Sequence, residues 1–418
     1  MGRITFVSIV ALLFVVMDWY VFQSVKFAIN EFANNWRKLI YIVYWSITAL
    51  CVAGLLYYNL GGKAEMSREL RTIIFSLLFL NFFSKIFGVL FLLIDDLGRV
   101  IRWAWASISD QQTTKVHATK EYGINRSEFL VKSSLVATAI PALTMGFGIL
   151  SGAYNYRVKR TTVYLKNLPS SFDGIRIAQL SDIHSGSFFN KTAVQGGIDM
   201  LMGEKPDVVF FTGDLVNDRA EEMKEYQPIF NQVKAPLGVY STLGNHDYGD
   251  YASWKSPMAK KNNLDTLIKI HKQMGWDILM NEHRFLSQGS DKIAILGIEN
   301  WGTGGFAKYG KLNQAHAGTD AAAVKLLLSH DPSHWDAQVR KSYHDIDIMF
   351  AGHTHGMQFG IEVGDFKWSP VQYRYKQWAG LYQEENQHLY VNRGYGFLVF
   401  PGRIGILPEV TIMELKKG

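Results

Sequence analysis

The stretch that decides the fold is an apolar run ending in polar residues, and positions 175–184 read IRIAQLSDIH. Its first six residues suit a strand buried on both faces, and Asp182 and His184 follow directly. Similar runs recur along the chain, separated by helical or loop stretches. The predicted strands are 175–180, 208–212, 239–243, 293–298, 324–329, 346–351 and 389–392. This alternation predicts layered α/β architecture, with β-sheets flanked by helices.

Polar residues end five of these runs. The clusters are Ser181-Asp182-Ile183-His184, Gly213-Asp214, Gly244-Asn245-His246-Asp247, Ser329-His330 and Gly352-His353-Thr354-His355. Because open α/β sheets place ligands beyond the carboxyl ends of their strands, we expect the clusters to meet at one edge. Taken singly, each cluster is typical of a turn, a cap or a structural histidine. Together, imidazole and carboxylate groups without thiolates suit Mn, Fe, Zn or Co, and the set is large enough for two ions.

The first 154 residues have a different character. A membrane-spanning helix needs about 20 mainly apolar residues, and four stretches qualify. They are residues 4–22, 39–60, 72–94 and 134–154. No small-residue cleavage pattern follows the first stretch, and residues 18–20 suit an interfacial end, so we expect an uncleaved helix. The sequence therefore predicts a four-helix transmembrane region at 1–154 and an α/β domain at 155–418.

The overall composition agrees with this division. Hydrophobic residues make up 48% of the 418 residues and charged residues 19%, which argues against disorder. The net charge of +6 is mild and much of the excess flanks apolar runs, which favours membrane-surface anchoring over nucleic-acid binding. The single cysteine, Cys51, excludes an intrachain disulfide and a Cys-based metal site. Eleven of the 12 histidines follow residue 155, which places the chemistry in the second domain.

Lys85 lies near the middle of the third apolar run, where an ionisable group is costly and usually faces a partner or a cavity. A helix-interface or snorkelling lysine is the simpler interpretation, and a transport role together with Asp18 is the alternative. The basic and aromatic connection at 95–133 is expected to lie on the membrane surface. The positive-inside rule does not orient the helices, because eight basic residues fall near one side and nine near the other.

The ordered set of polar clusters resembles the calcineurin-like metallophosphoesterase superfamily over residues 160–418. The runs 389–396 and 408–410 are similar to its YkuE-like branch, which includes membrane-anchored members and lipid A-pathway pyrophosphatases. The resemblance implies two divalent metal ions, with manganese expected. It implies that the first ion is held by Asp182, His184, Asp214 and His355. It implies that the second is held by Asp214, Asn245, His330 and His353, so that Asp214 bridges the two.

The resemblance also implies a catalytic role for His246, which would stabilise the transferring phosphoryl group and protonate the leaving oxygen. A purely structural histidine is the alternative. Relatives often carry an acid three positions after the bridging aspartate to orient this histidine. Here Asn217 occupies that position and Asp218 follows it, so the orienting partner is left open.

Two further residues are candidates for substrate binding. Arg393 can bind phosphate bidentately through its guanidinium, and a buried-pair arginine is the alternative. Gln358 matches the branch, and a role in loop structure is the alternative. Met357 stands where the branch usually repeats glycine. The aromatic and basic cluster at 373–378 is expected to pack, and a border of the membrane-facing pocket is the alternative.

We therefore expect a membrane-anchored, binuclear metal-dependent hydrolase that cleaves a phosphoester or pyrophosphate bond. Because the domain begins directly after a spanning helix, a lipid-linked or amphiphilic substrate is favoured. One alternative is a tethered phosphodiesterase acting on a water-soluble substrate, and another is a membrane binding or transport protein with a regulatory metal domain. The resemblance to lipid-precursor hydrolases favours the cytoplasmic face of a bacterial inner membrane for the catalytic domain.

Overall fold

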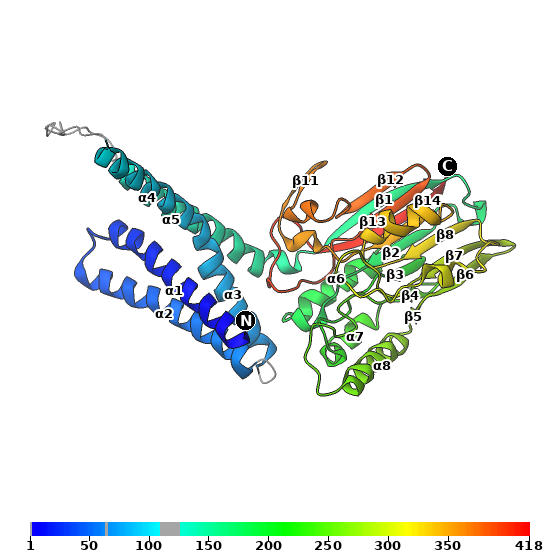
Figure 1. Cartoon of the computed structure of the whole chain (residues 1–418). Coiled ribbons are helices and arrows are strands. Elements are labelled where there is room, and N and C mark those ends of the chain that lie inside the picture. The colour runs from blue at the N-terminus through cyan, green and yellow to red at the C-terminus, as the bar shows by residue number, and fades with distance from the viewer. Residues whose placement is uncertain (1, 63–65, 109–125) are drawn as a thin grey trace. The chain divides into compact units, whose positions relative to one another are not determined.

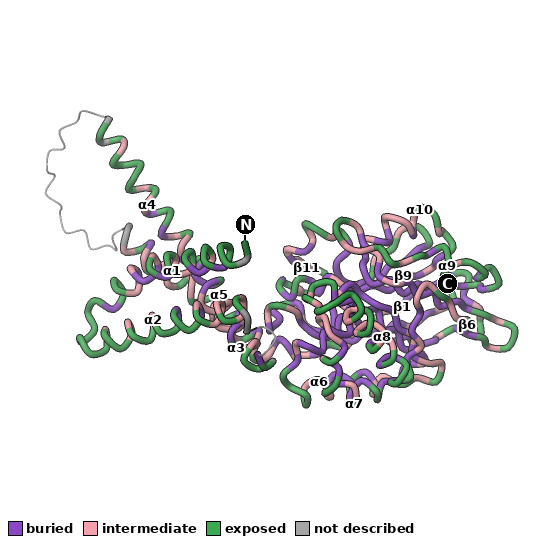
Figure 2. Tube along the Cα trace, turned by 60° about the horizontal axis from the view of Figure 1, so that its bottom comes forward, coloured by how far each residue is buried: buried purple, intermediate pink, exposed green. Residues whose placement is uncertain are grey.

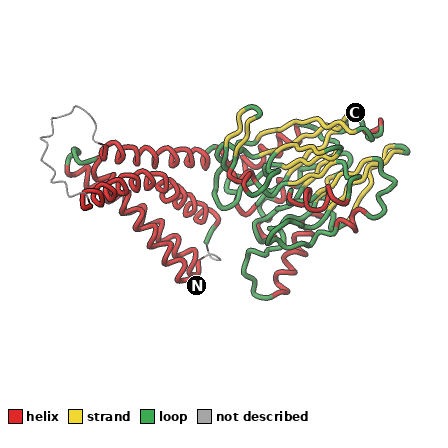
Figure 3. The backbone as a smooth tube through the Cα atoms, turned by 45° about the horizontal axis from the view of Figure 1, so that its top comes forward, coloured by secondary structure: helices red, strands yellow, loops and turns green. Residues whose placement is uncertain are grey.

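The computed structural model describes residues 2–62, 66–108 and 126–418. The chain forms two compact units, Met1–Phe147 and Gly148–Gly418 (Figure 1). The division falls inside the last apolar helix, before the boundary expected after residue 154, so the final turn of that helix belongs to the second unit. Among the described residues, the strands are confined to the second unit (Figure 3).

The first unit is helical. Its α-helices are α1 (Arg3–Ala28), α2 (Asn34–Tyr57), α3 (Arg68–Leu78), α4 (Ser84–Ile108) and most of α5 (Arg126–Leu150), and π-helical segments occupy Tyr58–Gly62 and Phe79–Phe83. Four segments are long and apolar enough to span a membrane: Ile4–Ala28, Asn34–Leu60, Glu69–Trp105 and Glu128–Tyr154. The four predicted spans are therefore confirmed, and each helix extends beyond the apolar run that predicted it.

The third span shows the largest difference from expectation. Residues 98–105, expected in a surface connection, continue helix α4 instead. Asp95 and Asp96 come just before this stretch, and the helix continues through them. Arg99 pairs with Asp95 one helical turn away, which stabilises the helix at this point. Residues 109–125 of the expected connection, including Lys115 and Lys120, lie outside the described residues, and residues 126–133 belong to helix α5.

Lys85 pairs with a carboxylate inside the helical unit. Its Nζ lies 2.6 Å from Asp18 Oδ1 and donates to Asn81 Oδ1 at 2.7 Å. Asp18 also accepts hydrogen bonds from Thr48 Oγ1 and Asn81 Nδ2, and it is fully buried. The expectation that Asp18 marks an interfacial end was therefore wrong, because α1 continues past it to Ala28 and the aspartate faces the lysine.

This buried ion pair predicts a specific pattern of stability. Lys85→Met should lower the free energy of unfolding by about 3 kcal/mol or more, because it leaves the Asp18 charge buried without its cation. The double variant Lys85→Met/Asp18→Asn should recover most of that loss. The measurement is denaturant unfolding of the full chain in detergent micelles, followed by tryptophan fluorescence.

Lys38→Met is the matched control, because Lys38 is an exposed lysine of α2. It should leave the free energy of unfolding nearly unchanged. A double variant as unstable as Lys85→Met would contradict a structural ion pair.

The second unit contains two six-stranded sheets and a separate hairpin. The first sheet has the order β1-β14-β2-β3-β4-β5, the second has the order β12-β13-β9-β8-β7-β6, and β10 pairs with β11. The strands of the first sheet are β1 (Arg157–Leu165), β14 (Glu409–Lys417), β2 (Arg176–Leu180), β3 (Val208–Phe211), β4 (Val239–Ser241) and β5 (Asp277–Ile278). Those of the second sheet are β12 (Gly380–Glu384), β13 (Gln387–Val391), β9 (Ile348–Ala351), β8 (Val324–Leu328), β7 (Asp291–Gly297) and β6 (Glu282–Gln288). The hairpin comprises β10 (Ile361–Val363) and β11 (Phe366–Trp368).

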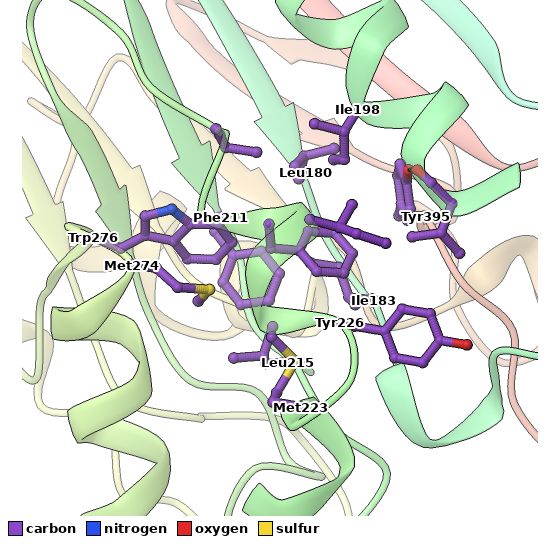
Figure 4. Close-up of a cluster of buried hydrophobic side chains, with 14 of the residues drawn as sticks. Leu180, Ile183, Ile198, Phe211, Leu215, Met223, Tyr226, Met274, Trp276 and Tyr395 are labelled. Atoms are coloured by element: carbon purple, nitrogen blue, oxygen red, sulfur yellow. Dashed lines mark hydrogen bonds between the residues drawn. The ribbon is translucent and has the colours of Figure 1, made fainter. Parts of the chain in front are cut away.

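Apolar side chains fill the space between the two sheets and cover their outer faces. Between the sheets, the rings of Phe210 on β3 and Phe350 on β9 meet edge to face at 5.0 Å. Outside the first sheet, Phe211 packs with Trp276 in a cluster that includes residues of α6 (Lys191–Gly203) and α8 (Pro257–Gln273) (Figure 4). The central strands are almost wholly buried (Figure 2). This burial explains why they read as continuous apolar runs in the sequence.

Parallel pairing brings the ends of the central strands together. β2, β3 and β4 are parallel neighbours, as are β7, β8 and β9. Parallel strands end at the same edge of a sheet, so the polar clusters that follow β2, β3, β4, β8 and β9 lie at corresponding edges of the two sheets. All seven predicted strands are present, and the predicted fold class is confirmed.

Candidate metal centre

A first group of possible metal ligands joins the ends of β2 and β9. Asp182, His184 and His355 each offer a ligand atom, and these atoms all lie within 4.8 Å of one another. His355 Nε2 is 3.3 Å from Asp182 Oδ1, and all three side chains are buried. The structure therefore brings His355 to Asp182 and His184, which lie more than 170 positions earlier in the chain.

A second group lies at the ends of β3, β4, β8 and β9. Asp214, His330 and His353 offer ligand atoms within the same limit, and His330 Nε2 is 3.1 Å from Asp214 Oδ2. His353 Nδ1 is 3.3 Å from His330 Nε2 and 2.8 Å from Asn245 Oδ1. Four side chains thus converge on one point.

Asp214 links the two groups. The same carboxylate oxygen that lies 3.1 Å from His330 Nε2 lies 3.5 Å from His184 Nε2 of the first group. A carboxylate in this position can bind two cations at once and reduce their mutual repulsion.

The donor atoms fit divalent cations. Ligand atoms about 2.1 Å from a shared ion lie roughly 3.0 to 3.4 Å from one another, close to the separations found here. His184 Nε2 and His355 Nε2 are buried and have no hydrogen-bond partner among the residues that the structure describes. A buried polar atom without a partner is costly, and a cation held by the first group would satisfy both.

Hydrogen bonds at the opposite ring nitrogens orient two of these histidines. His330 Nδ1 donates to the Thr212 carbonyl at 2.7 Å, and His184 Nδ1 lies 3.1 Å from Asn217 Oδ1. Both contacts direct Nε2 toward the centre, as expected of outer partners of a metal site.

The backbone is strained at most of these positions. Five of the seven expected ligands have positive φ: Asp182 (52°), His184 (49°), Asp214 (59°), His353 (71°) and His355 (50°). This left-handed conformation is unfavourable for residues other than glycine, and such strain clusters at functional sites. The surrounding structure therefore holds these residues in a backbone conformation that they do not favour, and this conformation sets the direction of their side chains.

Gly352 permits the two ligand loops to touch. A Cβ at this position would lie 2.0 Å from Ser181 Oγ and 2.1 Å from Asp182 Oδ2. The neighbouring His353 backbone N–H donates to Asp182 Oδ1 at 2.9 Å. Any larger residue at Gly352 would push the loop after β9 away from the loop after β2.

His246 stands beside the centre in a defined orientation. Its backbone N–H donates to Asp214 Oδ1 at 2.9 Å, and its Nδ1 lies 2.7 Å from the Asn217 carbonyl oxygen. The orienting partner that the sequence left open is therefore a main-chain carbonyl, which only folding could reveal. Because Nδ1 donates to that carbonyl, Nε2 is left for another group.

The structure adds residues to which sequence reasoning gave no role at the metal centre. Asp247 accepts hydrogen bonds from the backbone N–H groups of Asp214, Leu215 and Gly244 at 2.8 to 2.9 Å, and so positions the loops after β3 and β4. Its place beside His246 in the polar cluster was the available signal.

Tyr375 is the second such residue, because its OH lies 2.8 Å from His353 Nε2 and thereby turns Nδ1 of that histidine toward the centre. For the cluster at 373–378 the sequence predicted packing, with a border of the membrane-facing pocket as the alternative, and it indicated no contact with a metal ligand. The contact joins segments that are separated in the chain by the whole β10–β11 hairpin, so no local pattern indicates it.

Both candidate substrate-binding residues have structural partners instead. Arg393 is 5% exposed, and its Nη atoms contact Glu409 at 2.5 Å and Glu362 at 3.0 Å. Gln358 is also buried, and it donates to the carbonyls of residues 400 and 402 and accepts from residue 398. The structure therefore favours a buried ion pair and a loop-structural role, the two alternatives to substrate binding.

Burial and charge divide the histidines into two kinds. Burial lowers the pKa of His184 to about 3 and that of His353 to about 4, so both rings are neutral, as metal binding requires. Burial also acts to lower the pKa of His330, but the adjacent Asp214 carboxylate outweighs it and raises that pKa to about 10. Without a cation, the Asp214–His330 pair therefore holds a proton at neutral pH.

This pair predicts that metal binding releases a proton. His330 carries the proton below about pH 10 and must lose it to become a ligand, so metal affinity should rise with pH by up to about tenfold per unit in the neutral range. Calorimetric titration of the metal-free full chain with Mn²⁺, in two buffers of different ionisation enthalpy, should show about one proton released.

Asp214→Asn and His316→Ala provide the comparison. Asp214→Asn removes the anion that holds the proton, so it should abolish the buffer dependence. His316→Ala should preserve it, because His316 pairs with Asp345 instead. Equal heats in both buffers for the unaltered protein would contradict the assignment.

The comparisons with known proteins define the class. Residues 175–357 match the calcineurin-like phosphoesterase family, and residues 2–153 match a family described as the probable calcineurin-like phosphoesterase transmembrane domain. The chain belongs to the calcineurin-like phosphoesterase family and is a metal-dependent hydrolase with a membrane domain. Members of this family use divalent metals, and the two candidate ligand groups agree with that property.

Individual relatives refine the comparison. The chain is 30% identical over 304 residues to the metallophosphoesterase YkuE of Bacillus subtilis, covering 70% of this chain and 98% of that protein. It is 27% identical over 296 residues to the transmembrane protein with metallophosphoesterase domain of Danio rerio, covering 68% of this chain but only 63% of that protein. It is 27% identical over 278 residues to the UDP-2,3-diacylglucosamine pyrophosphatase LpxG of Chlamydia trachomatis, covering 55% of this chain and 81% of that protein.

Proposed function

We propose that the protein hydrolyses a phosphoester or pyrophosphate bond in a lipid-linked or amphiphilic substrate, using two divalent metal ions. The observation that carries the proposal is the pair of ligand groups joined by Asp214, in a unit that begins with the last turn of a membrane-spanning helix.

The proposed ligand sets combine the geometry with the family resemblance. The first ion would be held by Asp182, His184, Asp214 and His355, and the second by Asp214, Asn245, His330 and His353. Two ions bound there would supply polarisation of the phosphoryl oxygens and a lower pKa for a bound water. Manganese is the proposed metal because the donors are all nitrogen and oxygen, and the same set also suits iron, zinc or cobalt.

His246 is the proposed proton donor. Its Nδ1–H is held by the Asn217 carbonyl, so a protonated ring presents Nε2–H to the oxygen of the leaving group. Its backbone N–H binds Asp214, which fixes the ring beside the carboxylate that would bridge the ions. The imidazole can therefore stabilise the transferring phosphoryl group and then release its proton to the departing oxygen.

Two variants separate metal binding from proton donation. Asp214→Asn should abolish Mn²⁺-dependent hydrolysis of a generic aryl phosphodiester and weaken metal binding. His246→Ala should retain the bound metal but lower kcat by about 10² to 10⁴, the usual contribution of a general acid. The measurements are metal content and steady-state hydrolysis by the full chain in detergent.

His316→Ala is again the matched control and should hydrolyse the phosphodiester at the unaltered rate. Full activity in Asp214→Asn would contradict the proposed centre. Loss of metal from His246→Ala would contradict its role as a proton donor that does not bind metal.

The membrane context favours an amphiphilic substrate. The span Glu128–Tyr154 leads directly into β1. The unit that contains the metal centre therefore follows the membrane-spanning helix without a linker. The relative LpxG is named for a substrate that joins a nucleotide to an acylated sugar through pyrophosphate. The transport alternative has less support, because Lys85 and Asp18 satisfy each other's charge.

Substrate competition tests this preference. In detergent, the full chain should hydrolyse a lipid-linked pyrophosphate with a kcat/KM at least about tenfold above that for the same head group without acyl chains, a difference of about 1.4 kcal/mol. Equal values would instead support the alternative, a tethered enzyme that acts on a water-soluble substrate.

The proposed location of the metal centre is the cytoplasmic face of a bacterial inner membrane. The basis for this face is the resemblance to lipid-precursor hydrolases such as LpxG. Protease added to intact spheroplasts should leave the second unit uncut, and cleavage there would place the centre on the outer face.

A further inference from the structure

The β10–β11 hairpin has one apolar and one polar face. The pairing sets Ile361 opposite Trp368 and Val363 opposite Phe366, while Glu362 lies opposite Lys367. Side chains alternate across a strand, so the four apolar residues share one face and the two charged residues share the other. We call Ile361, Val363, Phe366 and Trp368 the apolar face of the hairpin.

The polar face is the one held against the rest of the unit. Glu362 Oε1 lies 2.8 Å from Lys159 Nζ and 3.0 Å from Arg393 Nη2. Lys367 Nζ donates to the Ala379 carbonyl and to the Tyr382 hydroxyl. The charges that would normally face water are therefore bound inward.

The apolar face points outward. Ile361 is 52% exposed, Val363 71% and Phe366 62%. Figure 1 shows the hairpin standing apart from the two large sheets. An antiparallel hairpin in water normally turns its apolar side to the core, so this arrangement is the reverse of the usual one. It is the orientation expected where the outer medium is apolar.

Exposed apolar residues continue beyond the hairpin. Phe359, whose ring lies 6.4 Å from that of Trp368, is 39% exposed, and Met357, two positions after the proposed ligand His355, is 59% exposed. The hairpin therefore lies close in the chain to the metal-binding loop.

A short series of backbone contacts connects the hairpin to a membrane-spanning helix. Gly360 N–H donates to the Ile404 carbonyl at 2.9 Å, and Ile404 N–H donates to the Gln358 carbonyl at 2.7 Å. The next residue back, Arg403, donates its N–H to the Gly148 carbonyl in the last turn of α5 at 3.1 Å. The contact is close, since a Cβ on Gly152 would lie 2.0 Å from the Arg403 carbonyl oxygen. Leu150, at the end of α5, is 88% exposed.

We propose that the apolar face of the β10–β11 hairpin inserts into the lipid bilayer beside the end of α5. The candidate span Glu128–Tyr154 ends four residues after Leu150, and the backbone contacts tie the hairpin to this last part of the span. The hairpin is then a second membrane contact of the second unit, with lipid acyl chains as its partner. If the proposed function holds, it also brings the metal-binding loop to the depth at which a lipid-linked phosphate lies.

Fluorescence quenching tests the insertion. Cys51 is the only cysteine of the chain, so a Cys51→Ala background accepts one labelled site at a time. Val363→Cys and Phe366→Cys are labelled with an environment-sensitive fluorophore, in the full chain reconstituted into phosphatidylethanolamine/phosphatidylglycerol nanodiscs. Acyl-chain nitroxide lipids should quench both labels at least twofold, while aqueous iodide should quench them weakly.

Met258→Cys is the matched control, because Met258 is also apolar and 62% exposed but lies on α8. Iodide should quench its label strongly and the nitroxide lipids should leave it unaffected. The proposal is overturned if the hairpin labels behave like the Met258→Cys label. Either hairpin position alone decides the matter, and the result needs no turnover, so it is independent of whether the proposed reaction is correct.

Discussion

The Asp214 carboxylate is the group on which the rest of the candidate site depends. It is 2% exposed, and a buried carboxylate is stable only where cations or hydrogen-bond donors compensate for the loss of water. Here His330 approaches one oxygen and the His246 backbone N–H binds the other, while Asp247 holds the Asp214 backbone. The loops after β3, β4 and β8 are thereby fixed around one charge, and a pair of metal ions would complete the compensation.

The same physical rule acts in the helical unit. Asp18 and Lys85 are both buried, and each is paired with the other and with polar neighbours. The hairpin shows the complementary case, because its charges turn inward to partners while its apolar side chains face outward. In all three places a charged side chain points toward groups of the protein that compensate its charge. In the hairpin, the apolar side chains are left to face outward.

Local patterns were sufficient for much of the fold and of the candidate centre. The apolar runs predicted the buried strands β2, β3, β4, β7, β8, β9 and β13 but missed the buried strand β14, and the polar residues after five of them predicted which side chains would meet. The patterns do not reveal partners that are distant in sequence. Arg393 is a candidate for phosphate binding because of its guanidinium, and only folding shows that Glu362 and Glu409 contact that group. Asp18 was placed at a membrane border because of its aromatic neighbours, whereas its partner Lys85 is 67 positions away.

What the sequence by itself determined is the division into a membrane region and an α/β domain, together with the identity of the polar residues at the strand ends. Both depend on composition and on the period of the apolar residues, which are local properties. Only the tertiary structure decided that His246 is oriented by a main-chain carbonyl, that Tyr375 directs His353, and that the β10–β11 hairpin turns its apolar face outward. These features depend on which distant segments become neighbours, and no local pattern contains that information.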